Sequence, residues 1–141
     1  MSYQFYKVLH YVGIFLILLP LGGACFHMAA GGTREWSLRK FAGMLHGIGL
    51  VLALVAGFGL LAKLHLGFPP WAIVKFVVWL ALGAAPVMIY RKGQMAKTWL
   101  LAILVLAVLN GWLAVYKPGG ASVETLTPPD STSVPDQVEP Q

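Results

Sequence analysis

Few polar side chains in this sequence could do chemistry inside a membrane, and those few interrupt long apolar stretches. They are His10, His27, His46, Lys75 and Asn110. A polar or ionisable group in a membrane is costly, so each of them is a candidate for a functional site. Imidazole nitrogen is a common metal ligand, and histidine holds haem iron in many proteins. The alternative for each residue is structural: a hydrogen bond to a neighbouring helix, or, for Lys75, a side chain that reaches the membrane surface.

The composition places the chain among integral membrane proteins. Of its 141 residues, 58% are hydrophobic and 11% are charged, against about 25% charged residues in soluble domains. The net charge of +5 does not indicate a nucleic-acid partner, because the basic residues lie between apolar runs rather than along one face. A single cysteine, Cys25, excludes an intramolecular disulfide and a paired-cysteine metal site.

The charged residues divide residues 1–117 into four apolar segments, each long enough for a membrane-spanning helix of about 20 residues. The sequence predicts helices over about 5–29, 41–63, 70–91 and 97–116. Gly31 and Gly32 should end the first helix, and Pro69 and Pro70 should begin the third, where proline is tolerated. We therefore expect an all-α integral membrane domain, a bundle of four transmembrane helices in contact with the lipid bilayer.

Basic residues are more frequent on one side of the predicted bundle than on the other. The loops after the first and third helices hold Arg34, Arg39, Lys40, Arg91, Lys92 and Lys97, whereas the other side holds Lys7, Lys63 and Lys117. Cytoplasmic loops of membrane proteins carry the excess of lysine and arginine. We expect a multi-pass protein of the bacterial cytoplasmic (inner) membrane with both termini on the extracytoplasmic side.

Residues 118–141 differ in composition from the helices. This segment is rich in proline, serine and threonine, and all of its charged residues are acidic. It lacks the apolar residues needed to bury a core, so the sequence predicts a disordered acidic tail. The tail is either simply solvated or a docking segment for a partner.

The polar residues divide into two layers when their depths are counted at a rise of about 1.5 Å per residue. His10, Lys75 and Asn110 lie about 6–9 Å inside the outer boundary on this count. Gly57 and Gly59 of the second helix fall near the same level. The sequence therefore predicts an outer layer to which all four helices contribute.

His27 and His46 form the inner layer, near the opposite side of the membrane. His10 and His46 should differ in height by about 15 Å, whereas two axial nitrogens of one haem are about 4 Å apart for metal–nitrogen bonds of about 2 Å. One haem therefore cannot use both. His10 with Lys75, or alternatively His27 with His46, could supply two ligands to a haem iron.

Small residues repeat at intervals of four in the second predicted helix. Gly43 and Gly47 form one pair, and Gly49, Ala53 and Gly57 form a longer stripe. Such stripes let helix backbones approach closely in lipid. They predict packing within the bundle, self-association or contact with other membrane protein subunits; the alternative is that the glycines leave room for a flat ligand.

The first predicted helix has features of its own. Residues 22–25 (GGAC) are expected to form a close-packing face, and Pro20, like Pro86 in the third helix, should kink its helix. A lipoprotein signal would need leucine three residues before Cys25, where Gly22 stands. The segment is therefore expected to be a retained helix rather than a signal peptide.

Three segments resemble families of small four-helix bacterial membrane proteins. They are KVLHYVG in the first helix, LRKFAGMLHGIGLVLALVAGFGLLAK across the second and PPWAIVKFVVWLALGAAPVMIYRK across the third. The sequence is similar to the SirB-like family, whose lysine, two histidines and W-x-x-x-K match Lys7, His10, His46, Trp71 and Lys75 here. It resembles more weakly the HemJ-type protoporphyrinogen oxidases, which share the first-helix histidine and the W-x-x-x-K. That resemblance implies haem binding at His10 and Lys75.

Two functional hypotheses follow. The first is a haem b-binding, cytochrome b-like protein in electron transfer or tetrapyrrole chemistry, and the alternative is a non-catalytic accessory subunit of a larger membrane complex. The spans hold no acidic residue for a proton path and no constellation for hydrolysis. The segment GGACFHMAAGG replaces the arginines and aromatic residues of the HemJ-type pattern, so enzymatic activity stays open, and an enzyme here would be a membrane oxidoreductase.

Overall fold

The structure, a computed structural model, describes residues 2–65 and 68–116 and consists of helices joined by short connections. The elements are α1 (Tyr3–Ala29), α2 (Arg39–Lys63), α3 (Pro70–Arg91), a 3₁₀ turn η1 (Gly93–Met95) and α4 (Ala96–Tyr116). The predicted tail, residues 118–141, lies outside the described residues.

All four α-helices are long and apolar enough to cross a membrane. Their bounds differ by at most two residues from the segments predicted from the sequence. Large apolar side chains point outward, and Phe15, Leu19, Val108 and Val115 are 71–75% exposed. A helix surface of this kind suits lipid rather than water. For the described residues, the prediction of an all-helical fold with four helices that can cross a membrane is confirmed.

Local sequence signals set the helix ends. The Ser2 side chain accepts a hydrogen bond from the Phe5 amide (3.3 Å) and caps α1. At the other end of α1 the Gly32 amide donates to the His27 carbonyl (2.9 Å), and Gly31 adopts a φ of 81°. This is a Schellman motif, in which glycine takes the left-handed position. The predicted end of the first helix is confirmed, and α3 begins at the expected pair of prolines.

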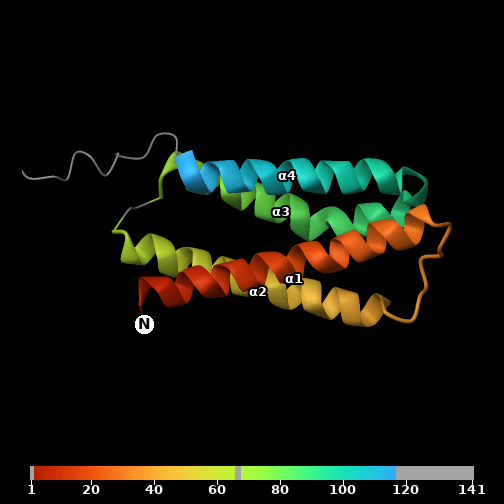
Figure 1. The fold of residues 1–141 in the computed structure, drawn as a ribbon, viewed down its shortest axis with the longest axis horizontal. Helices are drawn as coiled ribbons and strands as arrows, with labels where there is room; N and C mark the ends of the chain where they lie inside the picture. The colour runs from red at the N-terminus through yellow and green to blue at the C-terminus, as the bar shows by residue number, and fades with distance from the viewer. Residues whose placement is uncertain (1, 66–67, 117–141) are drawn as a thin grey trace, which may run out of the picture.

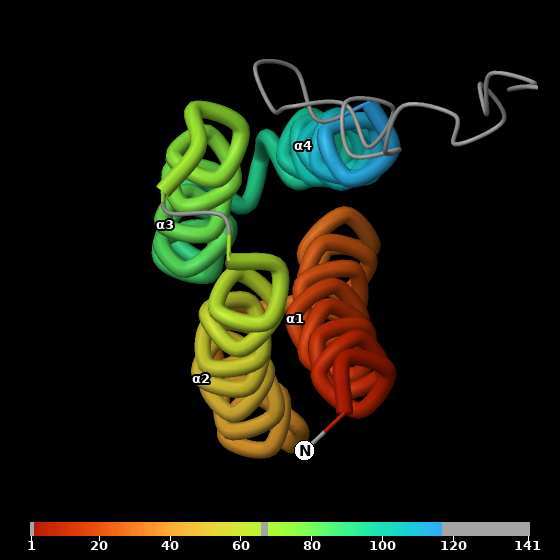
Figure 2. Tube along the Cα trace, turned by 90° about the vertical axis from the view of Figure 1, so that its left-hand side faces the viewer, coloured from red at the N-terminus to blue at the C-terminus, as the bar shows by residue number. Residues whose placement is uncertain are grey.

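The helices form two layers, a close α1–α2 pair and a looser α3–α4 pair (Figures 1 and 2). α1 is in contact with all three other helices. Figure 1 shows α1 and α3 beginning, and α2 and α4 ending, at the same end of the bundle. We name this the outer end; the inner end carries the α1–α2 and α3–α4 connections.

The α1–α2 pair depends on two glycines where the helices cross. A Cβ added at Gly13 would lie 2.6 Å from the Ala53 amide nitrogen. One added at Gly49 would lie 2.8 Å from both the Gly13 carbonyl oxygen and the Ile17 amide nitrogen. Side chains are not found at such distances, so only glycine permits this backbone contact. Of the stripe predicted in the second helix, Gly49 and Ala53 therefore do pack against α1.

Other glycines expected to pack lie away from helix contacts. A Cβ would meet nothing within 4 Å at Gly22, Gly23, Gly43 and Gly47. The predicted close-packing face at 22–25 is therefore wrong for its two glycines, although Ala24 and Cys25 are buried. Successive helical residues are about 100° apart around the axis, so four in a row cannot share one face.

The buried core lies mainly in the inner half of the bundle. Leu21, Cys25 and Ile89 are each at most 1% exposed and belong to one cluster that joins α1 to α3. A smaller cluster around Trp71 and Leu113 joins α3 to α4 toward the outer end. The α3–α4 layer is therefore held to α1 by apolar contacts, while the glycine crossing holds α2.

Gly49→Ala should weaken the α1–α2 pair, because the added methyl group must displace the α1 backbone. Overpacking of this kind lowers the free energy of unfolding by about 1–3 kcal/mol. An unfolding titration of the purified protein in mixed detergent micelles, followed by circular dichroism, measures the change.

Gly47→Ala is the matched control, because a Cβ there meets nothing and should leave the free energy of unfolding unchanged or slightly raised. Equal destabilisation by the two substitutions would show that the backbone contact is not what holds the pair.

Candidate functional site

His10 points from the outer half of α1 toward α2. Its Nδ1 lies 2.8 Å from the Ala53 carbonyl oxygen, and because a carbonyl oxygen can only accept, Nδ1 carries the proton. Nε2 is then the nitrogen with the lone pair. Metal-ligating histidines are oriented in this way, with a carbonyl holding the second ring nitrogen. Gly57 lies beside the ring, and a Cβ there would be in ordinary van der Waals contact with His10 Cε1, at 3.4 Å.

The structure places Lys75 in the vicinity of His10. The two side chains are near enough to interact electrostatically. Lys75 Nζ also lies over the indole ring of Trp71, 5.3 Å from its centroid, where the ring attracts a cation. The Lys75 side chain is half-buried, and two members of the predicted outer layer therefore lie within electrostatic range of each other.

Two buried polar atoms toward the outer end have no hydrogen-bond partner within 2–65 and 68–116. They are Trp71 Nε1 and Asn110 Oδ1. Trp71 is 8% exposed, so its N–H has lost water without gaining a protein acceptor, and such groups are uncommon in native proteins. Asn110, the third member of the outer layer, thus accepts no hydrogen bond from His10 or Lys75. A donor on α3 and an acceptor on α4 are available to a bound group.

His46 is the most buried histidine, with 6% of its surface exposed. Its Nδ1 lies 3.3 Å from the Ile17 carbonyl oxygen of α1, so Nδ1 carries the proton here too. Nε2 is buried and has no hydrogen-bond partner in the described part of the chain. The Gly83 carbonyl of α3 is near the ring but outside hydrogen-bonding geometry. One ring nitrogen therefore joins α2 to α1 while the other is unpaired.

The two histidine contacts follow from a spacing shared by both helices. Residues 10–17 (HYVGIFLI) and 46–53 (HGIGLVLA) have the common pattern H-x-x-G-x-x-x-apolar. Because α1 and α2 run antiparallel, the histidine that opens each segment bonds to the carbonyl of the residue that closes the other. We call these two hydrogen bonds, on either side of the glycine crossing, the reciprocal histidine pair.

This crossing also sets the distance between the two predicted layers. His10 bonds to Ala53, which lies seven residues beyond His46 on α2. The two histidines are therefore separated by about 10 Å along α2, less than the 15 Å expected from the sequence. The sequence count assumed that the helices begin level with the membrane boundary, whereas the glycine crossing fixes their actual register. The separation still exceeds the roughly 4 Å between two axial nitrogens.

His27 contacts the connection after α1 rather than His46. Its ring stacks on Trp36 with centroids 4.7 Å apart, and its Nε2 lies 3.0 Å from the Thr33 carbonyl oxygen. Gly32 packs against the ring, where a Cβ would collide with it. The structure therefore does not bring together the two histidines of the inner layer, and His27 holds the loop in place.

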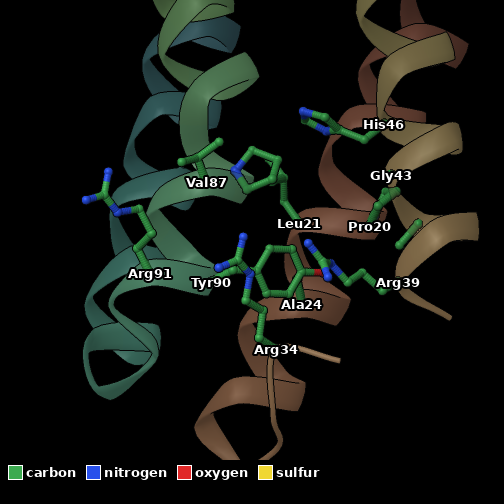
Figure 3. Close-up of a pocket in the computed structure, with 12 residues that line it drawn as sticks. Pro20, Leu21, Ala24, Arg34, Arg39, Gly43, His46, Val87, Tyr90 and Arg91 are labelled. Carbon is green, nitrogen blue, oxygen red and sulfur yellow. The ribbon is translucent and has the colours of Figure 1, made fainter. Parts of the chain in front are cut away.

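A pocket of about 490 Å³ lies at the inner end between α2 and α3, with α1 as its back wall (Figure 3). It has an apolar wall and a basic mouth. The wall consists of Pro20, Leu21, Ala24, Ala42, Gly43, Pro86 and Val87, and the mouth consists of Arg34, Arg39, Tyr90 and Arg91. Figure 3 shows His46 at the opposite end of the pocket from Arg34 and Arg39. We name this cavity the inner pocket.

Tyr90 joins the α1–α2 loop to α3 at the mouth of the inner pocket. Trp36 Nε1 donates a hydrogen bond to the Tyr90 hydroxyl (3.1 Å). The Arg39 guanidinium lies over the Tyr90 ring, 5.4 Å from its centroid. Glu35 is the sole acidic residue within 2–65 and 68–116, and it forms no ion pair with the arginines of the mouth. Their positive charge is therefore not neutralised by a described carboxylate.

In the described part of the chain, neither His10 nor His46 belongs to a group of three or more His, Cys, Asp or Glu side chains that could hold a metal ion. A metal ion bound by side chains alone needs about four ligands. The arrangement suits a group that takes one or two ligands from the protein, such as haem.

Comparison with known proteins found no match among family models, curated proteins or solved structures. The resemblance to SirB-like and HemJ-type proteins therefore stays a prediction. What the chain does must be inferred from its own side chains.

Sequence reasoning missed the inner pocket. It treated Arg34, Arg39 and Arg91 as loop charges that set orientation, and nothing in their spacing shows that they gather around one cavity. The reciprocal histidine pair, in contrast, has a signal in the sequence. The pattern H-x-x-G-x-x-x recurs in the first two helices, and antiparallel packing brings the two copies together.

Trp36→Phe keeps a ring that can stack on His27 but removes the N–H that Tyr90 accepts. We expect the loop at 30–38 to open more often, because a lost hydrogen bond costs about 1 kcal/mol. Limited proteolysis in detergent should show cleavage after Arg34 about fivefold faster, since cleavage follows the population of the open form.

Trp112→Phe is the control for that substitution, because Trp112 packs on Tyr116 at the outer end and should leave the cleavage rate unchanged. An unchanged rate in Trp36→Phe as well would mean that the bond to Tyr90 does not hold the loop.

Proposed function

We propose that this chain is a small haem-binding protein of cytochrome b type in which His10 holds the iron of haem b in the outer layer. Lys75 in its neutral form is the candidate for the second ligand, since an ammonium group has no lone pair to bind iron. The observation that carries the proposal is the 2.8 Å hydrogen bond from His10 Nδ1 to the Ala53 carbonyl. It leaves Nε2 as the nitrogen that can bind a metal, in the tautomer that metal-ligating histidines use.

Two observations favour the outer layer over the inner one. The inner layer lacks its second ligand, because His27 is stacked on Trp36 and bonded to Thr33. In the outer layer Lys75 lies within electrostatic range of His10 and is available as a second ligand. The unpaired Trp71 Nε1 and Asn110 Oδ1 could bond to a group with its own polar substituents, although unpaired buried atoms also lie at the inner end.

Haem iron supplies reversible one-electron transfer when it is bound. The part of this chain is to bind and orient the group. His10 would hold the iron through Nε2, and the Trp71 N–H would be available as a donor to a carboxylate of the haem. The apolar helices exclude water around the site, and burial of this kind is one of the factors that set the potential of a haem.

We also propose that the inner end of the bundle faces the cytoplasm of a bacterial cell. Of the described residues, six basic ones lie at the inner end, and two, Lys7 and Lys63, lie toward the outer end. An excess of this kind marks the cytoplasmic side. The haem proposed at His10 would then lie in the extracytoplasmic half of the bilayer.

An absorption spectrum tests the haem proposal. The protein purified from haem-supplied cells should show a Soret band, and His10→Ala should lower haem occupancy at least about tenfold, since loss of even a residue that orients a ligand costs 10–100-fold in metal affinity. Lys75→Leu, which has no donor atom, should retain the haem but change its spin state, because the proposed second ligand would be lost.

His27→Ala is the matched control. It removes an imidazole from the same helix, and that imidazole is bonded to the α1–α2 loop rather than to the proposed haem. It should leave the Soret band intact. A colourless wild-type protein, or a band lost in His46→Ala but kept in His10→Ala, would contradict the assignment to the outer layer.

Reporter fusions test the orientation. Alkaline phosphatase, which is active outside the cytoplasm, should be active when fused after Tyr116 and inactive when fused after Lys92, because the two positions lie at opposite ends of the bundle. The reverse pattern of activity would invert the proposed topology.

A further inference from the structure

We infer that the inner pocket binds the phosphate-bearing headgroup of an anionic membrane lipid. The observation behind this inference is the combination of three arginines at the mouth of the pocket with a buried, unpaired histidine at its far end. It is independent of the haem site proposed at His10, which lies on the other side of the glycine crossing.

The charge of the mouth favours an anion. Arg34, Arg39 and Arg91 come from the loop, α2 and α3, and the only described carboxylate, Glu35, does not pair with them. Guanidinium groups recognise phosphate oxygens through paired N–H donors. Basic pockets between transmembrane helices on the cytoplasmic side bind acidic lipid headgroups. The chemistry of the mouth is therefore that of a phosphate site.

The depth profile of the pocket matches a lipid better than a free ion. Arg39 begins α2 and Arg91 ends α3, so the mouth lies at the boundary of the membrane spans. His46 lies seven residues into α2 from Arg39, about 10 Å deeper, and the wall between them is apolar. A lipid has the same order along its length: a charged headgroup, then ester groups, then hydrocarbon. A phosphate ion would occupy the mouth alone.

His46 provides a polar atom at the depth of the ester groups. Its Nε2 is buried without a hydrogen-bond partner in a ring that is 6% exposed. A bound lipid would bring ester oxygens and their waters to this level, and a water bridging an ester oxygen to Nε2 would satisfy both. A bound lipid would therefore explain why His46 Nε2 has no hydrogen-bond partner beside the apolar wall of the pocket.

The pocket is also open on the side where lipid is found. Its walls come from α1, α2 and α3, and α4 contributes no lining residue. Figure 3 shows α2 and α3 on either side of the cavity with α1 behind it. Gly43 lines the pocket, and a Cβ there would meet nothing within 4 Å. A lipid can therefore enter sideways between α2 and α3 from the bilayer.

Native mass spectrometry of the full chain in detergent micelles tests the site, with phosphatidylglycerol and phosphatidylcholine as probes. The wild type should retain phosphatidylglycerol in preference. The double variant Arg39→Gln/Arg91→Gln should lose affinity for phosphatidylglycerol at least about tenfold, because the charge-assisted hydrogen bonds of two guanidinium groups to the phosphate are lost.

The matched control is Lys40→Gln/Lys92→Gln. Each lysine is the next residue after one of the two arginines and does not line the pocket, so the net charge falls by the same amount. Retention of phosphatidylglycerol should stay near the wild-type level. Equal losses in the two double variants would mean general attraction to the inner end and would overturn the site.

Filling the pocket gives a test that leaves the charge unchanged. Gly43→Leu places a side chain in the cavity and should reduce phosphatidylglycerol retention, whereas Gly47→Leu, one turn further along α2 and not part of the lining, should not. Both positions have room for a Cβ, so both variants should fold, which circular dichroism would verify. Equal phosphatidylglycerol retention by the two variants would contradict binding of the lipid in the inner pocket.

Two further measurements distinguish a lipid headgroup from free phosphate and from haem propionates as the group bound at the arginines. Inorganic phosphate at millimolar concentration should not displace phosphatidylglycerol, and displacement would assign the mouth to a free anion instead. The Soret band should be unchanged in Arg39→Gln/Arg91→Gln. Its loss there would place haem propionates at the arginines and overturn the lipid, whereas an absent band in all variants would contradict only the haem proposal.

Discussion

The reciprocal histidine pair at the glycine crossing is the interaction on which the rest of the bundle depends. Helices in lipid gain little from burying apolar surface, so close backbone packing and interhelical hydrogen bonds must hold them together. Gly13 and Gly49 provide the first, and His10 and His46 provide the second. An imidazole is costly in a membrane by itself. Here each one bonds to the opposite helix through Nδ1, and Nε2 is left to bind another group.

The crossing also determines where binding sites can form. Beyond it, toward the inner end, α1 packs with α3 and the start of α4 while α2 lies on the opposite side (Figure 1). α2 and α3 are therefore separated with α1 behind them, and the inner pocket lies in that separation. Trp36 and Tyr90 bridge its mouth, so the loop that closes the α1–α2 hairpin also positions the arginines.

The fold was predictable from composition, because four apolar segments bounded by charges leave few alternatives, and helix ends followed from Gly31 and the prolines before α3. Which residues make up each site was harder to predict from the sequence. Depth counting grouped His10 with Lys75, which the structure places within electrostatic range of each other, but it paired His27 with His46, which the structure separates. Depth along a helix does not say which way a side chain points. Association with partner subunits stays a prediction.

The reciprocal histidine pair lies entirely within the first two helices, which has a consequence for how the protein is made. The segment up to residue 63 leaves the ribosome before α3, and it already contains both partners of each histidine–carbonyl bond. The α1–α2 hairpin can therefore pair the imidazoles of His10 and His46 as soon as it enters the bilayer, before α3 and α4 are made. Biogenesis then proceeds by adding α3 and α4 to a preassembled two-helix template.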